Sequence, residues 1–579
     1  MGRGWNLNVW DKCREAYRQG GLSYLLEKVW QKLRGRGGGN LYERERLAEA
    51  PAYGAWLAAR RPGEAERERQ RRFVFPRAPF FSIVVPVYNT KPLYLEALVR
   101  SIRDQTYGNW ELILADGASP EPATRDCLQS LIRCDRRLRV EWLAANEGIS
   151  GNTNRGIGAA RGDYIVFSDH DDLWEPDALF EIARAIDATG ADCVYTDEDK
   201  LLGDTLTFYE PHQKPGPSPE TLRSCNYVCH LMAASRPLLE KAGFLDSRFD
   251  GSQDHELTLR LWDATEKIAH VPKVLYHWRQ FGQSMSKQHL ERCQAAGRLA
   301  VREHLARRGL KGEVTQDCGY RVRYDVPPDL KVSVVLSVPG NDTVLSAAAA
   351  ALREKTSHPA MEFLLLADPP LPHATEGVRF LPAQEGESPY AAWNRAAREA
   401  TGDYLLFLDA RLKPLDAGWL TELLMFAGQS DIGAVGGKLL YPGGERIFAT
   451  NYCLTANGVV REFQRHSVHR LGTAARELLA RNVSAVPEQL LLVKKADFAL
   501  AGGVDEGYRH QLGDVDLCLR LAALGRRHIY TPFAVLEFAA LEGELPLDGR
   551  TDYERLRRQW PDADHDPYCQ RSWRDETED

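Results

Sequence analysis

The stretch GDYIVFSDHDD at residues 162–172 decides the fold class of this chain. An apolar run that ends in acids is typical of a buried strand whose carboxyl end lies at the rim of a sheet. Three earlier runs have the same character: FFSIVVPVYN (80–89), ELILADGAS (111–119) and RVEWLAAN (139–146). Amphipathic stretches that predict helices alternate with them. We therefore expect an α/β fold with a mostly parallel sheet and helices on both faces.

Polar residues follow three of the predicted strands, at Tyr88-Asn89, at Asp116 and at 169–172. In parallel sheets, ligands bind outside the carboxyl ends of the strands, so these tips should converge on one site. Asp169 and Asp171 are carboxylates at alternate positions, which suits a hard divalent cation such as Mg²⁺ or Mn²⁺. Such an ion neutralises a diphosphate leaving group. A solvated acidic turn is the alternative for this short motif taken alone.

Further candidate residues lie downstream and are each open to a structural interpretation. Asp254, in QDHELTLRL, is suited to deprotonate an acceptor hydroxyl, although a carboxylate there also caps a helix. His277 is a candidate metal ligand, although a single histidine near a strand end is more often structural. Cys225, Cys229 and His230 lie close together without a second ligand pair, so buried thiols are the better interpretation.

The second half of the 579-residue chain repeats the first. Asn154-Arg155 and GDYIVFSD recur 240 positions later as Asn394-Arg395 and GDYLLFLD, and QDHELTLRL (253–261) recurs as GDVDLCLRL (513–521). Two copies of one α/β unit explain the length better than four unrelated domains. We predict a catalytic domain over 77–325, a related domain over 326–545 and a C-terminal tail over 546–579.

Residues 1–76 are expected to form a basic helical arm. They hold 16 Lys and Arg against 9 Asp and Glu, a net charge of +7, which leaves −14 for the rest of a chain whose total is −7. Apolar residues repeat at helical spacing between Leu22 and Leu33, with lysines and arginines beside them. A helix lying on an anionic membrane and a helix packed on the main body both fit this pattern.

Composition narrows the class of protein. Apolar residues make up 44% and charged residues 27%, which is typical of globular domains. No apolar run is long enough to cross a bilayer, and the first ten residues lack the apolar core of a signal peptide. Eleven scattered cysteines favour a reducing compartment, and the net charge argues against nucleic-acid binding. We expect a cytoplasmic protein, peripheral to the inner face of the cytoplasmic membrane if the arm binds lipid.

Over about residues 80–290 the chain resembles the family-2 glycosyltransferases with the GT-A fold. The resemblance rests on SIVVPVYN, NWELILADGAS, DHDD and QDHELTLRLW. YTDEDKLLG and VLYHWR are similar to a bacterial subfamily that builds O-antigens and other cell-surface polysaccharides. A weaker resemblance continues through 330–570, which implies two tandem GT-A units. A nucleotidylyltransferase and a dinucleotide dehydrogenase fit less well, because their glycine-rich loops are missing after the first strand.

The resemblance implies transfer of a sugar, with inversion, from a nucleotide-diphosphate sugar to a growing glycan or lipid-linked glycan. It also implies roles for single residues. The nucleotide-sugar contacts would be Pro86, Tyr88, Asn89, Asp116, Asn154 and Asp169; the ligands of Mn²⁺ or Mg²⁺ would be Asp169, Asp171 and His277; and the catalytic base would be Asp254.

The second copy departs from this pattern. Its acidic motif reads Asp409-Ala410-Arg411, and an arginine in place of the second acid repels a divalent cation. Glu537 or Phe538 stands where relatives have histidine, while Asp514 and Asp516 keep the position of the base. We expect an inactive second copy with a scaffolding or acceptor-binding role. A bifunctional transferase and a non-catalytic assembly scaffold are the alternatives.

Overall fold

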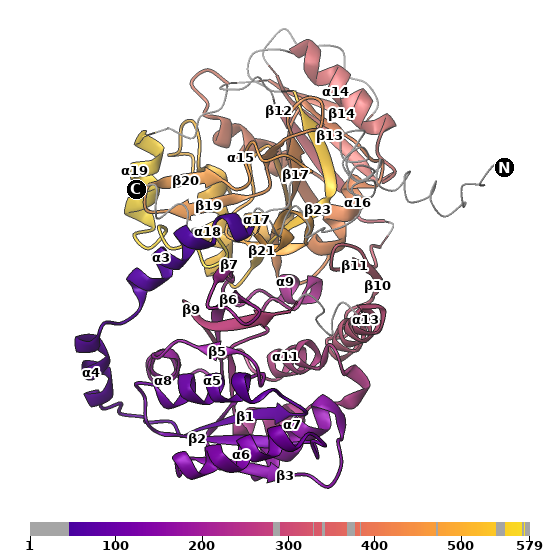
Figure 1. Ribbon diagram of the computed structural model, residues 1–579. Helices are drawn as coiled ribbons and strands as arrows, with labels where there is room; N and C mark the ends of the chain where they lie inside the picture. Colours follow the sequence, from indigo (N-terminus) through magenta and orange to yellow (C-terminus); the bar gives the residue numbers. More distant parts are fainter. Residues whose placement is uncertain are drawn as a thin grey trace, which may run out of the picture. The chain divides into compact units, whose positions relative to one another are not determined.

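The computed structural model describes residues 46–281, 290–327, 329–337, 342–367, 377–382, 384–469, 473–539, 550–569 and 573. These residues form two units (Figure 1). The first unit runs from Glu45 to Tyr324 and includes Trp573, and the second runs from Asp325 to Cys569. The apolar face predicted between Leu22 and Leu33 lies outside the described residues. Within the described part of the chain, no helix combines the length and the apolar character needed to cross a bilayer.

The first unit alternates strands and helices as predicted. Its elements are α3 (Ala50–Arg60), α4 (Glu64–Arg72), β1 (Phe81–Val87), α5 (Pro92–Arg103), β2 (Trp110–Asp116), α6 (Pro122–Cys134), β3 (Leu138–Trp142), α7 (Gly148–Ala159), β4 (Tyr164–Phe167), β5 (Leu173–Trp174), α8 (Ala178–Thr189), β6 (Cys193–Leu202), β7 (Phe208–His212), α9 (Pro219–Ser224), β8 (Met232–Ser235), α10 (Arg236–Ala242), η1 (Ser247–Phe249), α11 (Gln253–Ala264), β9 (Ile268–Gln280), α13 (Leu290–Arg307), β10 (Gly312–Gln316) and β11 (Tyr320–Tyr324).

Nine strands of the first unit form one mixed sheet in the order β3-β2-β1-β4-β8-β6-β9-β5, with β7 paired to β6. The strands β3, β2, β1 and β4 are parallel, β8 is antiparallel to β4 and β6, and β6 is parallel to β9. The α/β class and the parallel half of the sheet were therefore predicted correctly. Because β1, β2 and β4 are parallel, their carboxyl ends lie at one edge.

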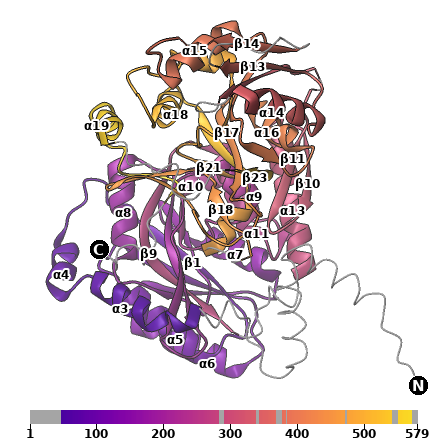
Figure 2. The same cartoon turned by 90° about the horizontal axis from the view of Figure 1, so that it is seen from above.

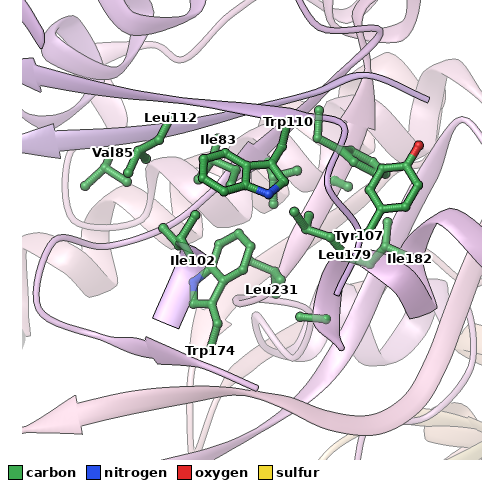
Figure 3. Close-up of a cluster of buried hydrophobic side chains, with 14 of the residues drawn as sticks. Ile83, Val85, Ile102, Tyr107, Trp110, Leu112, Trp174, Leu179, Ile182 and Leu231 are labelled. Atoms are coloured by element: carbon green, nitrogen blue, oxygen red, sulfur yellow. The ribbon is translucent and has the colours of Figure 1, made fainter. Parts of the chain in front are cut away.

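The core of the first unit lies between this sheet and its helices. All residues of β2, and all residues of β1 except Pro86, are buried, as the continuous apolar runs predict. Trp110 and Trp174 pack among aliphatic side chains of α5 and α8 (Figure 3). Helix α8 lies along β9 (Figure 2). At about 25 cal/mol per Å² of apolar surface, this burial is the main stabilising term of the unit.

The second unit has the same topology. Its elements are β12 (Val332–Ser337), α14 (Asp342–Glu354), β13 (Met361–Ala367), β14 (Val378–Pro382), α15 (Pro389–Glu399), β15 (Tyr404–Asp409), β16 (Leu412–Pro414), α16 (Trp419–Ala427), β17 (Ile432–Leu440), β18 (Ile447–Ala449), β19 (Tyr452–Thr455), β20 (Gly458–Arg461), η2 (Thr473–Leu478), β21 (Arg481–Val483), β22 (Leu490–Lys494), α17 (Lys495–Leu500), α18 (Gly513–Ala523), β23 (Arg527–Phe538) and α19 (Arg550–Gln559). The sheet order β14-β13-β12-β15-β22-β17-β23-β16 repeats that of the first sheet, strand for strand.

Two segments that the sequence analysis sets apart as arm and tail are built into the units. Tyr53 and Leu57 of α3 pack with Val274 and Trp573 in a small apolar cluster of the first unit. In the second unit, Asp566 accepts hydrogen bonds from the Leu454 amide and the Ser484 hydroxyl.

A disulfide joins Cys453 of β19 to Cys569, across a sequence separation of 116 residues. Widely spaced cysteines carry no pairing signal in the sequence, and the sequence analysis expected reduced thiols. The Cα atoms are 5.6 Å apart, within the usual range for a disulfide.

Candidate functional site

The polar tips of β1 and β2 meet at the carboxyl edge of the first sheet. The strand register places Val87 beside Asp116 and Asp116 beside Trp142. The Asp116 side chain is buried, whereas Tyr88 is 44% and Trp142 is 40% exposed. Two exposed aromatic rings thus end the strands on either side of a buried carboxylate. Trp142 was missed by the sequence analysis, although its place at the end of a predicted strand was the available signal.

Asn89 shapes the turn after β1. Its backbone N–H donates to the Ser119 hydroxyl at 2.9 Å, and its side-chain oxygen accepts from the Glu121 N–H at 3.2 Å. Its φ of +50° lies in the left-handed region that asparagine tolerates. Pro86 is half-buried within β1, one residue before the strand ends. Asn89 therefore ties the end of β1 to the loop that follows β2.

Asn154 has a structural role that repeats in both units. Its side chain donates to the Leu245 carbonyl at 2.8 Å and accepts from the Leu245 N–H at 3.0 Å. Asn394 makes the same pair of bonds with Val504, both at 2.8 Å. These contacts engage both ends of the Asn154 amide, so a backbone clamp explains the asparagine of the repeated motif.

The acids after β4 form a cluster with a histidine that the sequence analysis left among structural residues. Ligand atoms of Asp169, Asp172 and His230 all lie within 4.8 Å of one another, and His230 Nε2 is 3.4 Å from Asp169 Oδ2. Carboxylate oxygens suit Mg²⁺ and Mn²⁺, and an imidazole nitrogen suits divalent transition metals. Asp171 is adjacent, with its side chain 23% exposed and its carbonyl accepting from Arg279 Nε at 2.6 Å.

The protonation of this cluster shows how closely its charges interact. Burial raises the pKa of Asp172 well above its usual value, and the charges of Asp171 and Asp169 raise it further. Burial also raises the pKa of Asp171. Burial opposes the ionisation of Asp169, but His230 outweighs it and lowers the pKa. A divalent cation would relieve the repulsion among these carboxylates, so the residues present fit such an ion.

The structure does not bring His277 to this cluster, because side chains alternate along β9. Tyr276 faces the acids and bonds to Asp172 through its hydroxyl. His277 faces the other side, where Nδ1 is 2.6 Å from Asp199 and Nε2 is 2.8 Å from Glu175. Burial opposes protonation of His277, but the two carboxylates outweigh it and raise its pKa to about 9. Both ring nitrogens are therefore engaged in ion pairs away from the metal candidates.

Asp254 lies in the first turn of α11 beside the residues that lead to His230. Its Oδ2 accepts from Asn226 Nδ2 at 2.8 Å and is 3.6 Å from Cys229 Sγ. His230 is the next residue along the chain. The proposed base and the acid cluster are thus connected through two consecutive side chains. Cys229 was interpreted from sequence as a buried thiol and His230 was given no role, and only the fold places them here.

At the equivalent edge of the second sheet, an arginine of the acidic motif pairs with the aspartate that is retained there. Arg411 binds the Asp409 carboxylate through two nitrogens, with Nε–Oδ1 at 3.0 Å and Nη2–Oδ2 at 2.7 Å. Matching the strand registers aligns Asp172 with Leu412, His230 with Gln489 and Tyr276 with Leu536. A bidentate guanidinium therefore neutralises the one acid that is retained.

The position of the base also differs in the second unit. Asp514 aligns with Asp254, and Glu488 takes the place of Cys229. Burial raises the pKa of Asp514 well above its usual value, and the neighbouring Glu488 adds to this. The pKa of Glu488 is raised as well, mainly by burial. Asp514 therefore lies beside a second buried acid, whereas Asp254 lies beside Asn226 and Cys229.

Comparisons with known proteins find one family in both units. The model of glycosyl transferase family 2 matches residues 82–242 and 369–469, one segment in each unit. The O-antigen biosynthesis protein RfbC of Myxococcus xanthus is 32% identical over 83% of this chain. The uncharacterized protein y4gI of Sinorhizobium fredii is 31% identical over 84% of it. The chain spans 39% and 56% of the lengths of these two relatives.

A solved structure is also similar, at a lower level. The S. aureus TarS fragment 1-349 in complex with UDP-GlcNAc is 20% identical, covers 39% of this chain and 66% of its own, and has a TM-score of 0.33. A TM-score of that size adds nothing to the assignment, which rests on the family model and the two sequence relatives. By the family model, residues 82–242 and 369–469 of this chain belong to glycosyl transferase family 2.

Proposed function

We propose that the first unit transfers a sugar from a nucleotide-diphosphate sugar to a growing cell-surface glycan. The observation that carries this proposal is the grouping of Asp169, Asp172 and His230 next to Asp254 at the carboxyl edge of the sheet. Asp171 remains a predicted cation contact beside this group. The name of the Myxococcus relative supports an O-antigen or similar polysaccharide as the product.

The nucleotide would bind at the ends of β1 and β2. Tyr88 and Trp142 offer exposed rings for a base, and Asp116 offers a carboxylate between them. Asn89 fixes the turn that carries Tyr88. Asn154 contributes through its clamp on Leu245, which positions the segment before α11.

The reaction we propose is an in-line displacement with inversion at the anomeric carbon. Asp169, Asp172 and His230 would hold Mn²⁺ or Mg²⁺, an ion that stabilises the negative charge of a diphosphate leaving group. Asp254 would accept the proton of the acceptor hydroxyl as its oxygen attacks. Asn226 donates to one oxygen of Asp254 and so orients the carboxylate.

The second unit is proposed to be non-catalytic toward nucleotide-sugars. Arg411 forms an ion pair with Asp409, the aspartate retained from the acidic motif. Leu412 and Gln489 supply neither a carboxylate nor an imidazole. Its role would be that of a scaffold or an acceptor-binding unit.

Residues 1–40 are proposed to contact an anionic membrane surface through their leucine and tryptophan side chains and their lysines and arginines. Deletion of residues 1–40 should release the protein from sedimented membranes of the producing cells. Unchanged partitioning would contradict this part of the proposal.

The central test is a donor screen on the full chain. Release of UDP, GDP or dTDP from a panel of nucleotide-sugars is measured with Mn²⁺, with Mg²⁺ and with EDTA. We expect turnover with at least one donor, and we expect EDTA to abolish it. No turnover and no cation-dependent nucleotide binding across the panel would favour the scaffold alternative. Turnover that EDTA leaves intact would contradict the cation site.

A further inference from the structure

The side chain of Tyr276 contacts all three residues of the candidate cation site, Asp169, Asp172 and His230. Its hydroxyl donates to Asp172 Oδ2 and accepts from the backbone N–H of Asp169 at 3.2 Å. Its ring stacks on the imidazole of His230, with ring centroids 4.9 Å apart and an interplanar angle of 24°. One residue therefore fixes both acids and the histidine relative to one another.

The position of Tyr276 in the sheet explains why it reaches this group. Trp174 of β5 pairs with Tyr276 of β9, and β6 lies on the other side of β9. Tyr276 is fully buried between these strands, so its hydroxyl has little freedom to turn elsewhere. The adjacent His277 faces away, into the ion pairs with Glu175 and Asp199.

The second unit provides an internal comparison. The position of Tyr276 is occupied by Leu536 and that of Asp172 by Leu412, and both leucines are buried. Buried leucines at both positions keep the packing while removing a hydroxyl and its carboxylate partner together. His230 is replaced as well, by Gln489. The tyrosine is thus absent from the unit that lacks the cation ligands, whereas the structural clamp of Asn154 is retained there as Asn394.

We infer that Tyr276 is a positioning residue for the cation site, which holds Asp172, the Asp169 main chain and the His230 ring in the arrangement that binds a divalent cation. This inference rests on the proposed function. Groups that orient metal ligands typically change metal affinity by about 10- to 100-fold when they are removed. Tyr276 would not touch the substrate, so its effect should appear in the cation dependence of the reaction.

The test compares Tyr276→Phe with the wild-type full chain by Mn²⁺ titration calorimetry and by activity at varied Mn²⁺. We expect Mn²⁺ affinity to fall by about 10- to 100-fold, with kcat recovering at saturating Mn²⁺ and little change in the KM for the donor. Tyr164→Phe is the matched control. Tyr164 donates its hydroxyl to the Ala191 carbonyl at 2.7 Å at the start of β4, and its loss should leave Mn²⁺ binding unchanged.

The possible outcomes separate this inference from the function it rests on. Unchanged Mn²⁺ affinity in a folded Tyr276→Phe protein would overturn the inference alone. Absence of Mn²⁺ binding by the wild type would overturn the proposed site and the inference with it. If Tyr276→Phe does not fold, Tyr276→Leu copies the second unit and should lose Mn²⁺ affinity at least as strongly. Wild-type Mn²⁺ affinity in the Tyr276→Leu protein would also overturn the positioning role of Tyr276.

Discussion

The two units share one sheet topology but carry different charged residues at the same edge of the sheet. The first unit gathers Asp169, Asp171 and Asp172 next to His230, and the mutual repulsion of these carboxylates is the basis of the proposed cation site. The second unit keeps one acid, Asp409, and pairs it with its own guanidinium. The buried strands that define the fold are retained in both. A few replacements at the strand ends therefore separate a candidate catalytic unit from a unit of the same fold that is proposed to be a scaffold.

The sharpest test of this contrast is at the two aspartates that align in α11 and α18. Asp254→Asn should lower kcat by about 10²- to 10⁴-fold, because a general base contributes that much to the rate. The matched change Asp514→Asn should leave kcat within about twofold, since Asp514 lies in the proposed inactive unit, whose acidic motif pairs with Arg411. The measurement is nucleoside-diphosphate release with donor and acceptor present. The reverse pattern would place catalysis in the second unit.

The disulfide should make the stability of the second unit depend on oxidation. Under oxidising conditions, Cys453→Ser should lower the free energy of unfolding of this unit by about 3 to 5 kcal/mol, because the bond closes a loop of more than 100 residues. Chemical denaturation with and without dithiothreitol measures this. Cys134→Ser is the control, since Cys134 is an exposed thiol of the first unit. If dithiothreitol leaves wild-type unfolding unchanged, the bond does not contribute in solution.

Cation binding should distinguish the units directly. The full chain should bind one Mn²⁺, and His230→Ala should weaken that binding by at least about 100-fold, since it removes a ligand atom. Gln489→Ala, at the equivalent position, should have no effect. Calorimetric stoichiometry and affinity provide both readouts. Two Mn²⁺ ions per chain would show that Arg411 does not block the second edge.

A buried histidine should make the second unit sensitive to acid. Burial lowers the pKa of His528 to about 4, and its ring is bonded to the Ala434 N–H and the Cys518 carbonyl. The unfolded chain takes up a proton near pH 6.5, so this stability is present above that pH and is lost as the pH falls toward 4. The loss at pH 4 should be about 2 to 3 kcal/mol.

The variant His528→Gln isolates this effect from other titrating groups. Its free energy of unfolding should fall less between pH 7 and pH 4 than that of the wild type, whereas His510→Gln, at an exposed histidine, should follow the wild type. Equal pH dependence of wild type and His528→Gln would rule out the contribution. The first unit has Ile268 at the position aligned with His528, but burial also lowers the pKa of His255 and His304 there, so the test rests on the variant and not on a comparison of the units.

Local patterns were sufficient for the parallel half of the first sheet. The apolar runs ending at Asn89, Asp116 and 169–172 predicted strands whose carboxyl ends meet, and the structure has β1, β2 and β4 side by side with those ends at one edge. The 240-residue repeat predicted the second sheet. Such predictions succeed because buried parallel strands leave a continuous apolar signal over several residues.

The site was harder to predict because it depends on contacts between distant segments. His277 was chosen as a metal ligand from its place near a strand end, but a shift of one residue along a strand reverses the face of the sheet. Tyr276 lies on the face of β9 that points toward Asp172. His230 comes from a loop that no local pattern links to Asp169. Trp142 followed a predicted strand and was available from sequence, but it was not selected.

The sequence by itself determined the α/β class, the duplication and the acids at the strand ends, because each is written in the order and polarity of neighbouring residues. The tertiary structure alone decided which side chains meet. It joined His230 and Tyr276 to Asp169 and Asp172, turned His277 toward Glu175 and Asp199, and paired Cys453 with Cys569. The physical reason is that strand register and strand crossing set these distances, and both are fixed only when the whole sheet packs.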